Sequence, residues 1–395
     1  MRVTSAGETT VDIVIPVHRR ERPILRAVKS VLAAQHEAVR ALVVCHNIGA
    51  DEIGAELVSA ELGDLTEHPR VRLLELRDGI PSPAGPLNCG LRHSEADYVG
   101  FLGSDDEFEP GVLDAWVGEL SGSPDLLIGQ LSSDGAGRIM APAPRIGRFA
   151  GLDPVADLLN YRTAPVGLLA RREFIAESGV RGGGSGDAGS GPSSGGRGPS
   201  PGFREGFRVG EDIALGLFLW NYAGDIRYSR CASGYLIRED GPDRVTGVPL
   251  PPAEILAPVR DAVGLPVIRA LSRRRRQAIA VKLLRHQVLE LLKAKHRAGI
   301  LDEALLTVAA DTAEELLAFA PGAGGFFNVP DARMLRAVRD RVLGDFVAAV
   351  ERAENLPYQR KLVSVNPLHT LAPESFYVRA RRTRLVPQHL RPAAS

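Results

Sequence analysis

The sequence contains few of the residues that crosslink a chain or fix it in a membrane. Its three cysteines, Cys45, Cys89 and Cys231, lie far apart and form neither a zinc-binding spacing nor a disulfide framework, which is typical of a reducing compartment. No apolar stretch reaches the length that spans a membrane, and the N-terminus lacks the basic region and apolar core of a signal peptide. These absences predict a cytoplasmic protein.

A global charge excess is also absent. Lys plus Arg and Asp plus Glu each number 48 in 395 residues, so the net charge indicates no nucleic-acid partner. The four arginines at 273–276 fit either a nucleic-acid or anionic-membrane contact or a solvated helix face. Acidic residues in the following helices favour the solvated face. Hydrophobic residues make up 44% and charged residues 24%, which is a globular composition.

Short apolar runs alternate with amphipathic patterns in the first part of the chain. The strand patterns lie at 12–17, 41–45, 71–76 and 98–102, and the helical patterns lie at 25–32, 50–61 and 83–94. This alternation predicts an α/β fold with a parallel, doubly wound, Rossmann-like sheet. The loops that follow the strands then meet at one edge of the sheet, where open α/β folds bind ligands. They carry His18, His46, Asn47, Asp78, Asp105 and Asp106.

Two adjacent carboxylates, Asp105 and Asp106, follow the buried strand at 98–102 directly. Carboxylate oxygens in that position suit Mg²⁺ or Mn²⁺ carried on a diphosphate. The alternative is a polar turn with a helix cap, because Asp is common at both. The convergence of the other polar loops on the same edge favours the ligand interpretation.

The chain continues with further short strands, a low-complexity segment and a second carboxylate pair. Strands are predicted at 126–131, 165–170, 226–228 and 235–237, a loop or hairpin at 134–150, a helix at 171–177 and a turn at 241–246. The Gly/Ser-rich segment 181–202 is predicted to be a flexible loop, which either closes over a ligand or is an inert insertion. Glu211 and Asp212 precede an apolar helix at 213–220, where acidic residues also complement the helix dipole.

The composition changes near residue 252, after which long amphipathic helices are predicted at 268–298, 301–320 and 331–354. We therefore expect an α/β domain at 1–250, a helical C-terminal domain at 251–360, and a partly disordered extension at 361–395. The helical domain is predicted to form a homo-oligomer, contact an acceptor or touch a membrane surface.

Several features, taken in order, resemble the family-2 glycosyltransferases, which have the GT-A fold. They are the apolar-Pro-Val segment 13–17, the helix end 30–35, Asn88-Cys89-Gly90, the acidic motif 101–106 with Pro110-Gly111, and Glu211-Asp212. The resemblance covers roughly residues 11–246. It implies an inverting hexosyltransferase-type enzyme that moves a sugar from a nucleotide diphosphate, with a UDP-sugar favoured, to an acceptor hydroxyl.

The resemblance also implies roles for residues. Asp105, with Asp106 beside it, matches the metal-ligand carboxylate that holds Mn²⁺ or Mg²⁺, and Asp212, with Glu211 as neighbour, matches the general base. The residues assigned to nucleotide-sugar binding are Pro16, Val17, His18, His46, Asn47, Asp78, Asn88, Ser104 and Arg244.

The chain departs from the family pattern at several of these positions. Gly103 stands where the family often has an Asp that holds the ribose. His46 or Asn47 replaces acidic residues that read the base, and a turn-forming Asn is an equal alternative. Asp78 either contacts the nucleotide or caps a turn with Gly79. Arg244, in place of a metal-binding His, is expected to pair with the diphosphate.

The expected partners are a nucleotide-sugar donor and a carbohydrate or other hydroxyl acceptor, such as a cell-envelope polymer, for a cytoplasmic enzyme at the membrane periphery. Nucleic acid is not expected. A non-catalytic protein that retains the fold is the alternative, motivated by Gly103 and by the missing metal-binding His. Another nucleotide-handling enzyme is disfavoured, because no GxGxxG follows the first strand and no phosphate loop is present.

Overall fold

The computed structural model describes residues 9–134, 137–138, 144–145, 147–162, 166–171, 200–238, 240 and 250–384. These residues form two compact units. The first draws on the ranges 1–137, 165–206 and 222–242, and the second on 138–164, 207–221 and 243–395. The second carboxylate pair, Glu211 and Asp212, therefore belongs to the second unit, whereas Asp105 and Asp106 belong to the first.

The first unit is built on a seven-stranded sheet in the order β12-β8-β11-β6-β1-β2-β5. Its strands are β1 (Val11–Val17), β2 (Val39–His46), β5 (Val71–Leu76), β6 (Tyr98–Phe101), β8 (Leu126–Ile128), β11 (Gly167–Ala170) and β12 (Ile226–Tyr228). Strands β6, β1, β2 and β5 are parallel neighbours, as predicted, and β8 is parallel to β12. Strand β11 is antiparallel to both β6 and β8, so the sheet is mixed at its middle.

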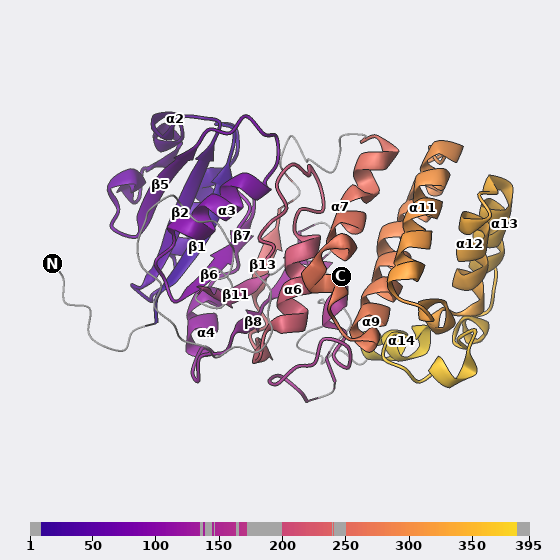
Figure 1. The fold of residues 1–395 in the computed structure, drawn as a ribbon. Helices are drawn as coiled ribbons and strands as arrows, with labels where there is room; N and C mark the ends of the chain where they lie inside the picture. Colours follow the sequence, from indigo (N-terminus) through magenta and orange to yellow (C-terminus); the bar gives the residue numbers. More distant parts are fainter. Residues whose placement is uncertain are drawn as a thin grey trace, which may run out of the picture. The chain divides into compact units, whose positions relative to one another are not determined.

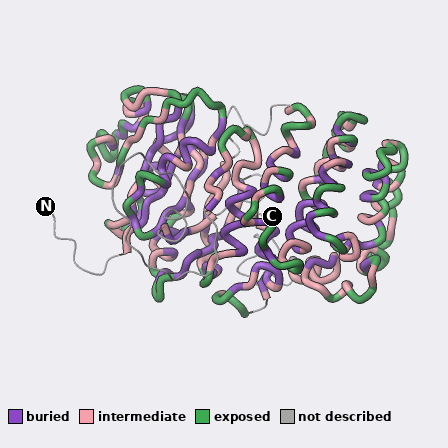
Figure 2. The backbone as a smooth tube through the Cα atoms, in the orientation of Figure 1, coloured by how far each residue is buried: buried purple, intermediate pink, exposed green. Residues whose placement is uncertain are grey.

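Helices cover this sheet because its strands are apolar on both sides. The helices are α1 (Ile24–Leu32), α2 (Ala50–Gly54), α3 (Ala84–His93) and α4 (Val112–Gly118). Alternate residues of β1, such as Val11, Ile13 and Ile15, share a core with α1 and α4, and all three are fully buried. Figure 2 shows this burial as the purple tube that runs through β1 and β2. The predicted helix at 50–61 is wrong in length, because α2 ends at Gly54 and a short turn leads into β3 (Val58–Ser59) and β4 (Gly63–Asp64).

A smaller sheet lies beside the end of β6 and carries much of the site. It includes β7 (Glu107–Phe108), β13 (Gly234–Ile237) and β9 (Gln130–Ser133), with β13 in the middle, and β10 (Gly137–Arg138) follows β9 in the chain. The predicted single strand at 126–131 is wrong, because Gly129 separates β8 from β9 and the two strands lie in different sheets. A Cβ at Gly129 would lie 2.1 Å from Trp116 Cζ2, so only glycine fits at this junction.

The second unit is mainly helical. Its helices are α6 (Ile213–Tyr222), α7 (Pro252–Gly264), α8 (Pro266–Arg269), α9 (Arg273–Leu283), α10 (Glu290–Arg297), α11 (Glu303–Phe319), α12 (Val329–Arg339), α13 (Leu343–Glu354) and α14 (Phe376–Arg384), with a π-helical segment at Leu284–Leu289. Helices α7, α11, α12 and α13 lie side by side in that order (Figure 1). The predicted helix at 331–354 is two helices, because Arg341 adopts a left-handed φ of 57° between α12 and α13.

Several sequence predictions fall outside the described residues. These are most of the helix at 171–177, residues 181–199 of the Gly/Ser-rich loop, the turn at 241–246 that contains Arg244, and the last part of the C-terminal extension. Among the residues that the structure describes, no helix is both long and apolar enough to cross a membrane.

Candidate functional site

The acidic motif forms a tight turn at the end of β6. Leu102 is buried and its N–H bonds to the Val14 carbonyl at 3.0 Å, which extends the pairing with β1 by one residue. The Asp106 N–H then bonds back to the Gly103 carbonyl at 3.2 Å. This turn places Asp105 and Asp106 at the carboxyl end of a parallel strand, where the sequence predicted a ligand site.

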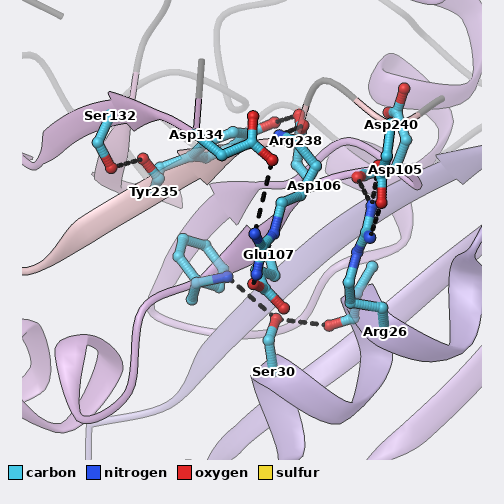
Figure 3. Close-up of polar contacts among 12 residues, drawn as sticks. Arg26, Ser30, Asp105, Asp106, Glu107, Ser132, Asp134, Tyr235, Arg238 and Asp240 are labelled. Carbon is cyan, nitrogen blue, oxygen red and sulfur yellow. Dashed lines mark hydrogen bonds and ion pairs between the residues drawn. The ribbon is translucent and has the colours of Figure 1, made fainter. Parts of the chain in front are cut away.

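The carboxylate of Asp106 is fixed by strand β13 and the residue after it. Its Oδ2 accepts a short hydrogen bond from the Tyr235 hydroxyl, and its Oδ1 accepts one from the Arg238 N–H at 3.0 Å. Figure 3 shows Tyr235, Arg238 and Asp106 drawn together. Burial raises the pKa of Asp106, and the two hydrogen bonds act in the opposite direction. Asp106 is thus a preoriented carboxylate with little freedom to turn.

The surroundings of Gly103 explain why glycine stands where the family that the sequence resembles often has an Asp. Its N–H donates to the Tyr235 hydroxyl oxygen at 2.9 Å. A Cβ at this position would lie 2.6 Å from Asp106 Oδ2 and 3.1 Å from the Tyr235 hydroxyl oxygen. Tyr235 and Asp106 therefore occupy the space that an Asp at 103 would need.

Asp105 is surrounded by arginines from the start of α1. Arg22, which is 7% exposed, forms an ion pair with Asp105 Oδ2. Arg26 donates to the Asp105 backbone carbonyl and pairs with Asp240 at 2.6 Å. In Figure 3, the Arg26 side chain points toward both Asp105 and Asp240. The turn therefore combines two carboxylates with two guanidinium groups, and guanidinium groups are well suited to phosphate oxygens.

The two carboxylates fit a divalent cation carried by a diphosphate. The Asp105 side chain is 22% exposed and is paired through Oδ2, which leaves Oδ1 for another ligand. The described residues contain no group of three or more His, Cys, Asp or Glu side chains that could hold a metal by themselves. Mg²⁺ is commonly bound by one or two carboxylates, with phosphate oxygens and waters as the remaining ligands, and this set fits that pattern.

A second acidic turn follows β5, and the structure brings three predicted nucleotide residues together there. His46 Nε2 lies 2.8 Å from Asp78 Oδ1, and Asn47 Oδ1 accepts the N–H groups of Asp78 and Gly79 at 3.1 and 2.9 Å. Burial acts to raise the pKa of Asp78, but its hydrogen bonds from the Ile80 N–H and from His46 lower it overall. Asn47 has a left-handed φ of 58°, which Asn tolerates, and its Oδ1 supports the turn by accepting these two N–H groups.

The other predicted nucleotide residues have varied settings. Pro16 is half-buried within β1, the Val17 side chain lies in the core, Ser104 is 5% exposed and His18 is exposed. Asn88 on α3 bonds to both backbone groups of Phe203, at 2.8 and 2.9 Å, and to Glu205 at 3.0 Å. Asn88 thus fixes the chain segment that follows the Gly/Ser-rich loop.

The pair Glu211-Asp212 lies at the N-terminus of α6 in the helical unit. Burial is the main cause that raises the pKa of Glu211 to about 7 and that of Asp212 to about 6. Lys282 on α9 is 3% exposed and acts electrostatically on Asp212, lowering its pKa. Burial in turn lowers the pKa of Lys282 to about 8. Burial therefore gives Asp212 a raised pKa of about 6, and a carboxylate with a raised pKa is a suitable candidate for a general base.

Sequence reasoning missed the residues that position these carboxylates. They are Arg22, Arg26, Tyr235, Arg238, Asp240 and Lys282. Each acts on a partner far away in the chain, as Tyr235 does on Asp106, so no local pattern marks it. The charged run at 18–22, which contains Arg22, is the one local signal for any of these residues, and it is equally typical of a polar loop.

Comparison with known proteins agrees with this fold. A family model, Glycosyl transferase family 2, matches residues 12–147. The succinoglycan biosynthesis protein ExoW of Rhizobium meliloti (strain 1021) is 34% identical over 104 residues, which are 26% of this chain and 31% of that protein. The chain therefore matches about a third of the length of that curated relative.

Solved structures of S. aureus TarS have the same fold. TarS 1-349 in complex with UDP-GlcNAc is 14% identical, with a TM-score of 0.66 over 89% of this chain and 93% of that one. The longer TarS structure gives a TM-score of 0.63 over 87% of this chain and 55% of that one. At this identity the likeness shows the GT-A fold and nothing further.

Proposed function

We propose that this chain, a family-2 glycosyltransferase with the GT-A fold, transfers a sugar from a nucleotide diphosphate to an acceptor hydroxyl with inversion at the anomeric carbon. The observation that carries the proposal is the acidic turn after β6. There, Asp106 is fixed by Tyr235 and Arg238, and Asp105 lies beside two arginines. This combination suits a metal-bound diphosphate.

The proposed reaction is a single displacement. Asp212 accepts the proton of the acceptor hydroxyl while the acceptor oxygen bonds to the anomeric carbon. The bond from that carbon to the diphosphate breaks, and its electron pair leaves with the diphosphate. Mg²⁺ or Mn²⁺, held by Asp105 and Asp106, would neutralise the charge that develops there. Arg22 and Arg26 would orient the diphosphate.

We propose a UDP-sugar as donor. The TarS structure with UDP-GlcNAc supports a nucleotide-sugar donor on this fold. The His46, Asn47 and Asp78 cluster supplies hydrogen-bonding groups at the end of β2 and β5 for a base, and Arg244 is proposed to contact the diphosphate. A polymer acceptor, such as a cell-envelope polymer, is proposed, and the match to a protein named for succinoglycan biosynthesis supports an acceptor of this class. A cytoplasmic location at the membrane periphery and a homo-oligomer of the helical unit remain predictions.

Nucleotide binding tests the proposal directly. The melting temperature is followed while UDP, GDP and dTDP are titrated with and without Mn²⁺. A metal-dependent rise with UDP is expected, and Asp105→Asn and Asp106→Asn should abolish it. Asp51→Asn, at an exposed position on α2, is the matched control. No rise with any nucleotide would contradict the proposal.

The alternative is a non-catalytic protein that retains the fold. Hydrolysis of UDP-sugars separates the two, because a slow transfer to water needs the same base. The wild type is expected to hydrolyse one UDP-sugar, and Asp212→Asn is expected to bind that donor without hydrolysing it. Equal, negligible release from both proteins, with metal-dependent binding retained, would favour the non-catalytic role.

A further inference from the structure

One short segment of the helical unit exposes an unusual share of the molecule's apolar side chains. Five of the eleven exposed large apolar residues in the described part of the chain lie within 14 positions. We call them the apolar edge: Tyr358, Val363, Val365, Leu368 and Leu371, which are 37, 49, 51, 89 and 77% exposed. Exposed clusters of this kind mark interaction sites more often than single exposed residues do.

The backbone holds the apolar edge outward. The Val365 N–H bonds to the Phe327 carbonyl at 2.7 Å, which fastens the segment beside the turn before α12. The ring of His369 stacks on Phe326, with centroids 4.0 Å apart and an interplanar angle of 13°. Leu368 lies on the short turn between these attachments. Its exposure therefore belongs to a braced conformation, and the ordering cost of presenting it has already been met in folding.

The charge of the same segment has one sign. Residues 355–371 contain Arg360 and Lys361 and no Asp or Glu. Neither cation forms an ion pair with an acidic residue among those the structure describes. Apolar tips with adjacent free cations are the composition of an interfacial anchor, in which the apolar groups enter the acyl boundary and the cations remain at the headgroups.

We propose that the apolar edge, with Arg360 and Lys361, docks the protein on an anionic lipid bilayer. A second copy of the chain fits less well. In a symmetric dimer the segment would meet its own copy, which brings like charges together with no acidic partner in the segment. A protein surface must also match the shape of a side chain as prominent as Leu368, whereas a fluid acyl layer accommodates it.

Vesicle binding tests the proposal and is independent of the transfer reaction. The full chain is sedimented with phosphatidylcholine vesicles and with mixed phosphatidylcholine–phosphatidylglycerol vesicles. Binding to the mixed vesicles is expected, with weak binding to the neutral ones. Neutralising both cations, Arg360→Gln with Lys361→Gln, should weaken partitioning by roughly thirtyfold. Replacing the two most exposed residues of the apolar edge, Leu368→Ser with Leu371→Ser, should weaken partitioning by roughly two orders of magnitude.

Matched controls make the outcome decisive. Ile300→Ser changes another apolar residue of the helical unit, 59% exposed, and should bind like the wild type. Unchanged melting temperatures show that each variant is folded. Equal binding to both kinds of vesicle, no binding, or an equal loss in Ile300→Ser would overturn the proposal. So would a concentration-dependent dimer that the leucine variant dissociates while no vesicle binding occurs.

Discussion

The Tyr235 hydroxyl lies between two groups of the acidic turn, accepting a hydrogen bond from the Gly103 N–H at 2.9 Å and donating one to the Asp106 carboxylate. Burial raises the pKa of Tyr235 well above its ordinary value, so this hydroxyl keeps its proton. Strand β13 thus sets the orientation of a carboxylate that lies on the loop after β6. The acidic turn after β6 and strand β13 are therefore expected to act as one unit.

Removal of this hydroxyl should weaken metal binding. In Tyr235→Phe, Asp106 loses a hydrogen bond that favours its charged form, so its pKa rises further and metal binding shifts to higher pH. We also expect unfolding to become easier by about 2 kcal/mol, because the Gly103 N–H loses its acceptor. The checks are urea unfolding and Mn²⁺ titration across pH.

Tyr228→Phe is the matched control. It removes a buried tyrosine hydroxyl that bonds to Gln130 Oε1 at 3.0 Å, away from the acidic turn. It should reduce stability without changing the pH dependence of Mn²⁺ binding. The interpretation of Tyr235 fails if both variants bind Mn²⁺ like the wild type.

A side chain at Gly103 should damage the site, although the family that the sequence resembles often has an Asp at this position. In Gly103→Ala, the Cβ would meet Asp106 Oδ2 at 2.6 Å, so Asp106 or Tyr235 must move. We expect the donor KM to rise about tenfold or more, as a misplaced binding group costs at least that much. Gly118→Ala, on the exposed side of α4 with nothing within 4 Å, should leave KM unchanged. A wild-type KM in Gly103→Ala would show that the turn relaxes freely.

Asn47 should prove to be mainly structural. Asn47→Ala leaves the N–H groups of Asp78 and Gly79 without their acceptor and places alanine at a φ of 58°, so stability should fall by about 2 kcal/mol. Asn47→Gly removes the same acceptor but relieves the backbone strain, so its stability should fall by less. Urea unfolding compares the two. If both variants keep wild-type stability but lose UDP binding, Asn47 is a base contact instead.

The fold of the sheet could be predicted where the local sequence pattern is sufficient. Runs such as Val11–Val17 are apolar on both faces and alternate with helices, which is sufficient for the parallel core. The wrong predictions of strand ends occur where a residue far away in the sequence determines the local structure. Gly129 ends β8 because Trp116 fills the space beside it. Helix α7 was also not predicted; it begins directly after Pro251 and contains Pro252 and Pro258.

The same division holds for the site. Asp105 and Asp106 could be proposed as site residues because carboxylates directly after a buried strand are visible in sequence, and Asp212 was proposed from the resemblance. The residues that orient and tune them were not, because Arg22 meets Asp105 across 83 positions and Lys282 acts on Asp212 from another helix. A single sequence contains no signal for such pairings.

The pH dependence of transfer should report on Asp212. Its pKa is raised from an ordinary 3.8 to about 6, mainly by burial. A general base must be unprotonated, and the pH profile of kcat/KM reports the pKa values of the free enzyme, so kcat/KM should rise with pH through about 6. The folded protein holds this proton more tightly than the unfolded chain does, so the group's contribution to stability should fall as pH rises from 4 to 6. Asp212→Asn should abolish transfer and remove this part of the pH dependence of unfolding.

Lys282 should set the pH at which the rate rises, which we call the pH limb. Its positive charge, present below its own pKa of about 8, lowers the pKa of Asp212. Lys282→Met removes the charge with little change in side-chain size, so the Asp212 pKa should rise and the increase of kcat/KM with pH should move to higher pH. Above the shifted limb the rate should recover, because the base itself is intact. Lys293→Met, on α10 in the same unit and paired with Glu290, should leave the limb where it is. A Lys282→Met enzyme with the wild-type limb would show that burial alone sets the pKa of Asp212.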